Sequence, residues 1–197
     1  MNGSKRLMYH SLISFEGRKR MNCIFNNLGA IVELSKMHCL LKEGEKMNTE
    51  LKRLNSTNIE ESTKLYMDVF NGEPWNDGWK LEDARERLVD IFKNPKFIGI
   101  GIYYDKEKLI GFLLGYTEKW LSSNHYYLNE MCVKTDLQSK GVGSKLLIEL
   151  ENTCEEKNIN RIYLLTARAG QAEAFYKKSN FYISPKMIMM SKRLDFN

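Results

Sequence analysis

A short stretch with two glycines decides the fold, and it reads Gln138-Ser139-Lys140-Gly141-Val142-Gly143-Ser144. It lies between a strand-like apolar run at 126–133 and a long amphipathic pattern, which places on one helical face Val142, Leu146, Leu147, Leu150 and Cys154. Glycine lets the main chain approach a ligand closely, and the first amides of a helix are free donors at the positive end of its dipole. The stretch therefore predicts an anion site suited to a pyrophosphate, to which Lys140 and Lys145 add positive charge.

The spacing within this stretch excludes two other phosphate-binding loops. A P-loop requires the order Gly-Lys-Ser/Thr, whereas the order here is Gly143-Ser144-Lys145. A dinucleotide-binding fingerprint requires a third glycine three residues after Gly143, and that position holds Leu146. Two glycines before a helix also occur in a plain strand-to-helix turn, so a turn without a ligand stays open as an alternative.

The residues on both sides of this stretch predict alternating secondary structure. Helical periodicity is expected at 59–70, 81–92, 141–158 and 171–179, and strand patterns at 49–54, 97–104, 108–117, 126–133, 161–166, 181–183 and 186–193. An antiparallel meander followed by a strand–helix–strand unit predicts an α/β chain of the mixed α+β kind. We expect a mixed, mostly antiparallel central sheet of about six to seven strands with helices on both faces.

Composition and charge favour one domain preceded by an extension. Residues 47–197 are expected to form the domain, and Met47 is a candidate for the native start. Residues 1–46 show no sustained period; they hold eight Lys or Arg and four Asp or Glu, so this extension carries +4 of the net charge of +5. The basic character is therefore weak evidence for nucleic-acid binding by the domain.

No stretch reaches the roughly 20 apolar residues of a membrane span, and no secretory signal pattern opens the chain. The four cysteines do not have zinc-ligand spacing, which favours a reduced, cytoplasmic protein without structural metal. We expect no membrane partner and no nucleic-acid partner, while the sequence leaves a homodimer open.

Two motifs resemble those of the GCN5-related N-acetyltransferase (GNAT) family. The run 128–133 and the following Gln138, Gly141 and Gly143 resemble the family's acetyl-CoA-binding motif, Gln/Arg-x-x-Gly-x-Gly/Ala. Further on, Ala174-Phe175-Tyr176 up to Phe181 resembles the family segment Phe-Tyr-x-x-x-Gly-Phe, with Asn180 in place of the usual glycine. Asparagine tolerates a left-handed helix cap, so this departure is mild. The resemblance covers about residues 49–193.

The resemblance implies acetyl-CoA as the co-substrate and a place for it. In the family the pyrophosphate rests on main-chain amides of the loop, and the pantetheine arm pairs with the preceding strand like an added strand. The strands 126–133 and 161–166 are then expected to splay apart and open a slot. Carried onto this sequence, the cofactor-binding residues are Met131, Cys132, Val133, Gln138, Ser139, Lys140, Gly141, Val142, Gly143 and Ser144.

The reaction of the family, direct attack of an amine on a thioester, requires a base, an oxyanion donor and an acid. The resemblance implies Tyr176 as the acid, because a phenol donates a proton without being charged at neutral pH. Glu130 is the candidate base, since strand alternation places it on the face opposite Met131. The main-chain N–H of Cys132 or Val133 is the expected oxyanion donor, and we do not expect Cys132 to be a nucleophile. Tyr176 as a packing residue and Glu130 as a binder of ammonium or backbone are the alternatives.

The loop between the early helices is the candidate acceptor site. In family members this region lines the acceptor pocket, and here it contains Trp75, Asn76, Asp77 and Trp79. Aromatic rings and an acid suit a cationic amine. Two tryptophans that only anchor the loop to the core are an equal alternative.

The sequence thus predicts an acetyl-CoA-dependent N-acetyltransferase that acts on a primary amine of a small-molecule or peptide acceptor. Polyamine-like, aminoglycoside-like and amino-acid acceptors fit the acidic and aromatic loop. A non-catalytic acyl-CoA-binding regulatory module is the alternative, and nucleic-acid binding through residues 1–46 is a third, weaker one.

Overall fold

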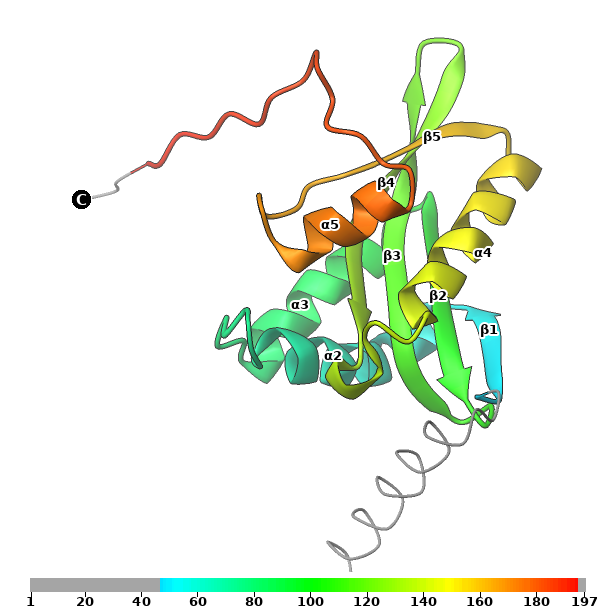
Figure 1. Cartoon of the computed structure of the whole chain (residues 1–197), viewed down its shortest axis with the longest axis vertical. Helices are drawn as coiled ribbons and strands as arrows, with labels where there is room; N and C mark the ends of the chain where they lie inside the picture. Colours follow the sequence, from blue (N-terminus) through cyan, green and yellow to red (C-terminus); the bar gives the residue numbers. More distant parts are fainter. Residues whose placement is uncertain (1–46, 195–197) are drawn as a thin grey trace, which may run out of the picture. The chain divides into compact units, whose positions relative to one another are not determined.

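A five-stranded sheet lies at the centre of residues 47–194, the part of the chain that this computed structural model describes (Figure 1). Its strands and the helices around it are β1 (Thr49–Arg53), η1 (Ser56–Asn58), α2 (Ile59–Phe70), α3 (Leu81–Phe92), β2 (Phe97–Tyr104), β3 (Lys108–Trp120), β4 (Ser123–Val133), η2 (Thr135–Leu137), α4 (Val142–Glu156), β5 (Ile159–Leu164) and α5 (Gln171–Lys178). They belong to one unit, residues 48–197. The extension expected at 1–46 lies outside the described residues.

The sheet has the order β1-β2-β3-β4-β5, in which neighbours in sequence are neighbours in space. The first four strands form an antiparallel meander, and β5 returns parallel to β4 after the crossover through α4. Helices α2 and α3 cover one face, while α4 covers the other (Figure 1). The prediction of a mixed, mostly antiparallel sheet with helices on both faces is confirmed.

Strand alternation divides the core between the two faces. On one face α2 and α3 pack on β2, β3 and β4, where Phe112 and Leu114 are fully buried. Gly111 directly precedes Phe112 and faces the other way, since a Cβ added to it would lie 3.3 Å from the side chain of Leu146 on α4. Within α3, Ala84 and Leu88 are completely buried, as their helical spacing predicts. No helix among residues 47–194 has the length and apolar character that a membrane span requires.

The two closing strands predicted at 181–183 and 186–193 are wrong, so the described sheet has five strands instead of six or seven. Residues 182–194 are all exposed and adopt neither helix nor strand. The apolar run at 187–190 has the composition of a strand, but β propensity measures how well a side chain packs on a sheet, not a preference of the isolated backbone. Without a neighbouring strand the pattern alone does not produce one.

Candidate active site

The candidate site begins where β4 separates from β5. The parallel ladder between them ends at the pair Leu128–Leu164, whereas β4 continues to Val133, paired only with β3. The separation follows a β-bulge, because Leu114 pairs with Glu130 and Gly115 with Leu128, which leaves Asn129 as the extra residue on β4. The edge of residues 129–133 that faces β5 is therefore open, as the expected slot requires.

Close packing holds the chain at this bulge. A Cβ on Gly115 would lie 2.0 Å from the carbonyl oxygen of Tyr127 and 2.7 Å from the hydroxyl of Tyr126, so only glycine fits there. Tyr126 is fully buried, and its hydroxyl donates to the carbonyl oxygen of Ile98 at 2.8 Å. The bent part of β4 is thus tied to the neighbouring strands, which gives the slot a rigid wall.

The start of α4 lies beyond the end of β4 and presents free amides. Gly141 precedes the helix with φ of 83°, a left-handed conformation, and a Cβ added to it would meet nothing within 4 Å. The first bond back along the helix runs from the N–H of Lys145 to the carbonyl oxygen of Gly141 at 3.1 Å. The amides of Val142, Gly143 and Ser144 come before it, and no side chain caps this helix end. This arrangement fits a diphosphate.

Other residues of the loop make packing contacts and hydrogen bonds that the sequence analysis did not predict. Gly143 faces α5, where a Cβ would lie 3.1 Å from the ring of Phe175. The side-chain amide of Gln138 donates to the carbonyl oxygen of Val133 at 3.0 Å, so it holds the loop against the strand. Lys145 donates to the Thr49 hydroxyl at 2.9 Å, whereas Lys140 is exposed. Ser139, with φ of 60°, completes the turn.

Tyr176 lies on α5 with its hydroxyl directed at β4. The hydroxyl donates to the sulfur of Met131 at 3.7 Å, beside the open edge of the slot. Burial raises the pKa of this phenol, and the charge of Glu130 raises it further, so the group stays protonated at neutral pH. Asn180 follows α5 with φ of 64°, which is the left-handed cap expected of a glycine substitute. The position and protonation of Tyr176 suit a proton donor.

Glu130 points to the opposite face, as alternation predicts, and is only 8% exposed. Nε of Arg87 on α3 donates to its Oε1 at 2.8 Å, and the second guanidinium nitrogen, Nη2, bonds the same oxygen. Burial raises the pKa of the Glu130 carboxyl, while Arg87 opposes that rise. The carboxylate therefore lies in a setting that suits a base, but with a cation already at one oxygen.

Arg87 is the functional candidate that the sequence analysis missed. Its guanidinium forms an ion pair with Glu130 and also lies over the ring of Trp79, 5.8 Å from the ring centre. A signal was present in the sequence, because Arg87 follows Ala84 by three residues and precedes Ile91 by four, on the apolar stripe of α3. A charged residue within such a stripe indicates a partner on the sheet beneath it.

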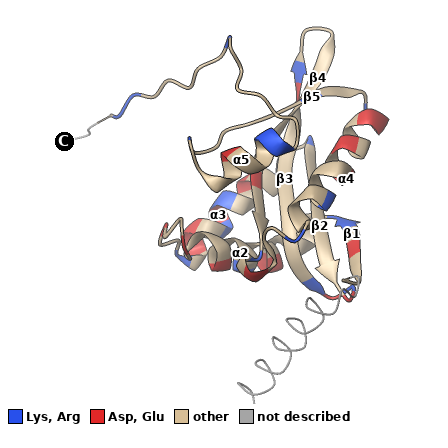
Figure 2. Ribbon diagram, in the orientation of Figure 1, with Lys and Arg blue, Asp and Glu red and all other residues tan. Residues whose placement is uncertain are grey.

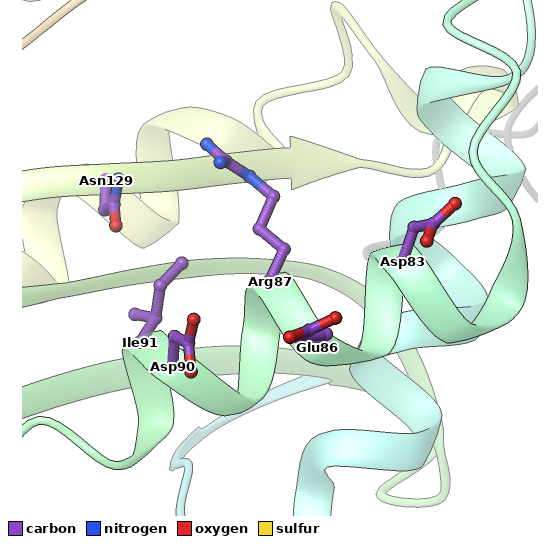
Figure 3. A pocket seen from close by; sticks show the side chains of 6 residues that line it. All are labelled: Asp83, Glu86, Arg87, Asp90, Ile91 and Asn129. Atoms are coloured by element: carbon purple, nitrogen blue, oxygen red, sulfur yellow. The ribbon is translucent and has the colours of Figure 1, made fainter. Parts of the chain in front are cut away.

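A cavity of about 360 Å³ opens beside this pair, between α3 and β4 (Figure 3). The residues that line it are Asp83, Glu86, Arg87, Asp90, Ile91 and Asn129. Figure 3 shows Arg87 reaching from α3 toward β4, with the three acids along the same helix. Charges of both signs follow α3 (Figure 2). Three exposed carboxylates on one wall favour a cationic ligand in this cavity.

The loop that the sequence analysis takes as the candidate acceptor site is fastened to the C-terminal end of α2. Trp75 packs on Phe70 with ring centres 5.6 Å apart, and the backbone N–H of Trp79 donates to the side-chain oxygen of Asn71 at 2.6 Å. The indole N–H of Trp79 donates to Asp77 at 3.1 Å. The negative charge of Asp77 contributes to the raised pKa of Glu130, so this part of the loop borders the candidate site. Trp75 packs only one face on Phe70 of α2 and remains 38% exposed.

Cys132 is buried beneath the site. Burial raises the pKa of its thiol well above the ordinary value, and Glu130 adds to the rise. The thiolate, which is the nucleophilic form, is therefore not populated at neutral pH.

Comparison with known proteins adds a family match and a fold match. The family model described as "Acetyltransferase (GNAT) family" matches residues 59–181, more than half of the chain. A search of curated proteins found no match. Among solved structures, the aminoglycoside acetyltransferase meta-AAC0020 from an uncultured soil metagenomic sample, in complex with sisomicin, has a TM-score of 0.61 at 16% identity, covering 75% of this chain and 97% of that one.

Two further solved structures are similar to the same extent. The aminoglycoside N-acetyltransferase AAC(6')-Iy in complex with CoA has a TM-score of 0.60 at 15% identity, covering 77% of this chain and 99% of that one. A transcriptional regulator from Bacillus halodurans C-125 has a TM-score of 0.61 at 16% identity, covering 74% and 100%. At these identities the likeness shows the fold alone.

Proposed function

Because the chain belongs to the acetyltransferase (GNAT) family, whose co-substrate is acetyl-CoA, we propose that it transfers the acetyl group to a primary amine of a small cationic acceptor. The observation that carries the proposal is the position of Glu130. This buried carboxylate lies next to a cavity with three further acids, and the adjacent residue, Met131, contacts Tyr176. A base on the acceptor side and an acid on the cofactor side are what the transfer needs.

The cofactor is proposed to lie along the open edge of β4 and the start of α4. Acetyl-CoA supplies the thioester carbonyl that the amine attacks. The free amides of Val142, Gly143 and Ser144 would hold the diphosphate, because they combine hydrogen-bond donors with the positive end of the helix dipole. The open edge of residues 131–133 would pair with the amide groups of the pantetheine arm.

The proton movements are assigned to two side chains. Glu130 takes a proton from the acceptor ammonium, directly or through water, which frees the nitrogen lone pair for attack. Tyr176 gives its phenolic proton to the departing sulfur, and its raised pKa keeps that proton available at neutral pH. A main-chain N–H of Cys132 or Val133 is proposed to bind the developing oxyanion.

A polyamine-like or aminoglycoside-like acceptor fits the cavity best. Three carboxylates along α3 attract a ligand with several ammonium groups. Acetyltransferases of similar fold have been solved with an aminoglycoside, which supports this class of acceptor. A peptide amine stays a weaker proposal, because the lining includes only one apolar residue, Ile91.

The ion pair between Arg87 and Glu130 is the observation that favours the second candidate, a non-catalytic acyl-CoA-binding module. A base whose carboxylate oxygen is held by a guanidinium is less free to accept a proton. The same pair also favours the ionised form of Glu130 and orients the carboxylate, because the Arg87 guanidinium opposes the rise of its pKa. We therefore prefer the enzyme and use turnover to separate the two.

The test is release of the CoA thiol with a panel of amines, including spermidine, kanamycin and lysine. Wild type should turn over at least one polycationic amine, and Tyr176→Phe should lower kcat by about 10²- to 10⁴-fold. Tyr182→Phe, in an exposed tyrosine, is the matched control and should retain the wild-type rate. Calorimetry with CoA should give the same affinity for all three proteins. Binding of CoA without turnover of any amine would favour the regulatory module.

We also propose that the protein works in the cytoplasm, because Cys132 and Cys154 are free thiols in the described chain. Mass spectrometry of the native protein without reduction would test this; a disulfide in that protein would contradict it.

A further inference from the structure

Tyr66 on α2 is a polar residue buried beneath the candidate active site. It is only 3% exposed, and its ring centre lies 4.5 Å from that of Phe70 and 5.5 Å from that of Trp79. The guanidinium of Arg87 lies over the ring of Trp79 as well. Because a buried hydroxyl needs a hydrogen-bond partner, we expect a partner for this phenol close to Arg87.

The hydroxyl of Tyr66 forms side-chain hydrogen bonds with Arg87 and with Glu130. A guanidinium has only donors and an ionised carboxylate only acceptors, so the phenolic oxygen accepts from Arg87 while its O–H donates to Glu130. Since Arg87 also donates to Oε1 of Glu130, the three side chains form a closed network. The network joins α2, α3 and β4.

This network restricts a carboxylate that would otherwise be held at one oxygen by one cation. Both bonds from Arg87 end at Oε1 of Glu130. A carboxylate that is bound in this way alone can still rotate about its last carbon–carbon bond. A donor from a second helix limits that rotation, and a hydrogen bond to the charged form also favours ionisation.

Core packing accounts for the ring of Tyr66 but not for its hydroxyl. Asn71 holds Trp79 through two hydrogen bonds, at 2.9 Å and 2.6 Å, and the ring of Trp79 packs edge-on against that of Tyr66. The ring of a phenylalanine would fill the same space. The polar atom therefore has a role that is separate from packing.

We propose that Tyr66 is a positioning residue, whose hydroxyl holds the carboxylate of Glu130 in one orientation beside the acceptor cavity. The inference rests on the proposed function, in which Glu130 is the base. Tyr66 acts through Glu130 and does not itself transfer a proton. Burial and the charge of Glu130 raise the pKa of its phenol, so that it stays protonated at neutral pH.

Other groups also act on Glu130, and the variants that test the proposal retain all of them. Burial raises the pKa of the Glu130 carboxyl, Arg87 lowers it, and Asp77 adds to the rise. Three further groups that interact with Glu130 have a pKa raised by burial, and they belong to Tyr127, Cys132 and Tyr176. Removing the hydroxyl of Tyr66 therefore removes hydrogen bonds but no charge.

The first test measures the pKa of Glu130 by ¹³C NMR of the full chain, labelled at the side-chain carboxyl of glutamate. Glu130→Gln identifies the signal, because that variant lacks it. In Tyr66→Phe the midpoint should rise by about one pH unit, about a tenfold loss of acidity, since a bond to the charged form is lost. Replacing Tyr66 with 3-fluorotyrosine, a stronger donor, should lower the midpoint instead.

The matched control is Tyr103→Phe. Tyr103 is 5% exposed, and its hydroxyl also donates to a carboxylate, that of Glu61. It belongs to β2, which does not pair with β4. This variant should leave the titration of Glu130 and the turnover rate unchanged, so it controls for the loss of a buried hydroxyl elsewhere.

The second test is turnover, measured by thiol release. Tyr66→Phe should lower kcat by about tenfold, with an unchanged KM for acetyl-CoA and an acidic limb of kcat/KM that moves upward by about one pH unit. A kcat or a Glu130 midpoint that matches wild type in Tyr66→Phe, or equal changes in Tyr103→Phe, would overturn the proposal. Failure of the proposed function is distinguishable, because wild type would then turn over no amine, while the NMR titration still decides whether the hydroxyl holds the carboxylate.

Discussion

Replacing Arg87 with glutamine tests whether Glu130 is the base. In the structure two bonds from the guanidinium reach Oε1 of Glu130, and the arginine side chain is 43% exposed while the glutamate is 8% exposed. Unit charges about 4 Å apart interact with about 4 kcal/mol at an effective dielectric constant of 20 and about 1 kcal/mol in water. Because Arg87 is partly in solvent, we take the lower half of that range, about 1–2 kcal/mol.

That energy corresponds to a rise of about one unit in the pKa of Glu130, since one unit is about 1.4 kcal/mol. The assay is the pH dependence of kcat/KM for the best amine, measured by thiol release with saturating acetyl-CoA. The acidic limb of the profile reports loss of the ionised base, and it should move upward by about one pH unit in Arg87→Gln.

The control is Arg85→Gln, which removes the same charge from the same helix. Arg85 forms an ion pair with Glu60 at 2.6 Å on the exposed surface. It is two residues before Arg87 and therefore lies on the side of α3 that faces away from Glu130. Its profile should match that of wild type. An acidic limb that stays in place in Arg87→Gln, or that moves equally in Arg85→Gln, would refute the assignment of Glu130 as a base held by Arg87.

Three further predictions concern stability and binding. Burial raises the folded-state pKa of Glu130, so protonation of this carboxyl favours folding, and that contribution to stability is lost as pH rises through the raised pKa. Removing Arg87 raises the pKa further and enlarges the loss. The melting temperature of Arg87→Gln should therefore fall relative to that of wild type between pH 5 and pH 8. Gly141→Ala and Gly78→Ala both place alanine at positive φ without a clash, so each should cost about 1–2 kcal/mol in urea denaturation, but only Gly141→Ala should weaken CoA binding, by about tenfold in calorimetry. Leu88 is completely buried, and Leu88→Ala should lower the free energy of unfolding by about 2–5 kcal/mol; a loss under 1 kcal/mol in the same denaturation assay would contradict the packing described for α3.

Local periodicity was enough to predict most of the elements. The stripes of α2 and α3, the hairpin between β2 and β3, and the glycine turn into α4 all lie where the pattern placed them. Each depends on residues within a few positions of one another, so the sequence carries the whole signal. The loop at 138–141 could also be predicted from neighbouring residues, because a glycine with a left-handed conformation before a helix is a local feature.

Long-range pairing was beyond the reach of such patterns. Arg87 and Glu130 are separated by 43 residues, and no local pattern around either residue indicates the other as its partner. The bulge at Asn129 has no distinctive residue type, although it opens the slot on which the site depends. The apolar run at 187–190 has the composition of a strand, but the described chain offers it no neighbour.

By itself, the sequence determined the helices, the first five strands and the turn of free amides that precedes α4, because side-chain periodicity and glycine conformation are properties of neighbouring residues. Only the tertiary structure decided that Glu130 has Arg87 as its partner, that β4 leaves β5 after Leu128, and that residues 186–193 have no strand beside them. These outcomes depend on which distant surfaces meet, and that is set by packing over the whole sheet.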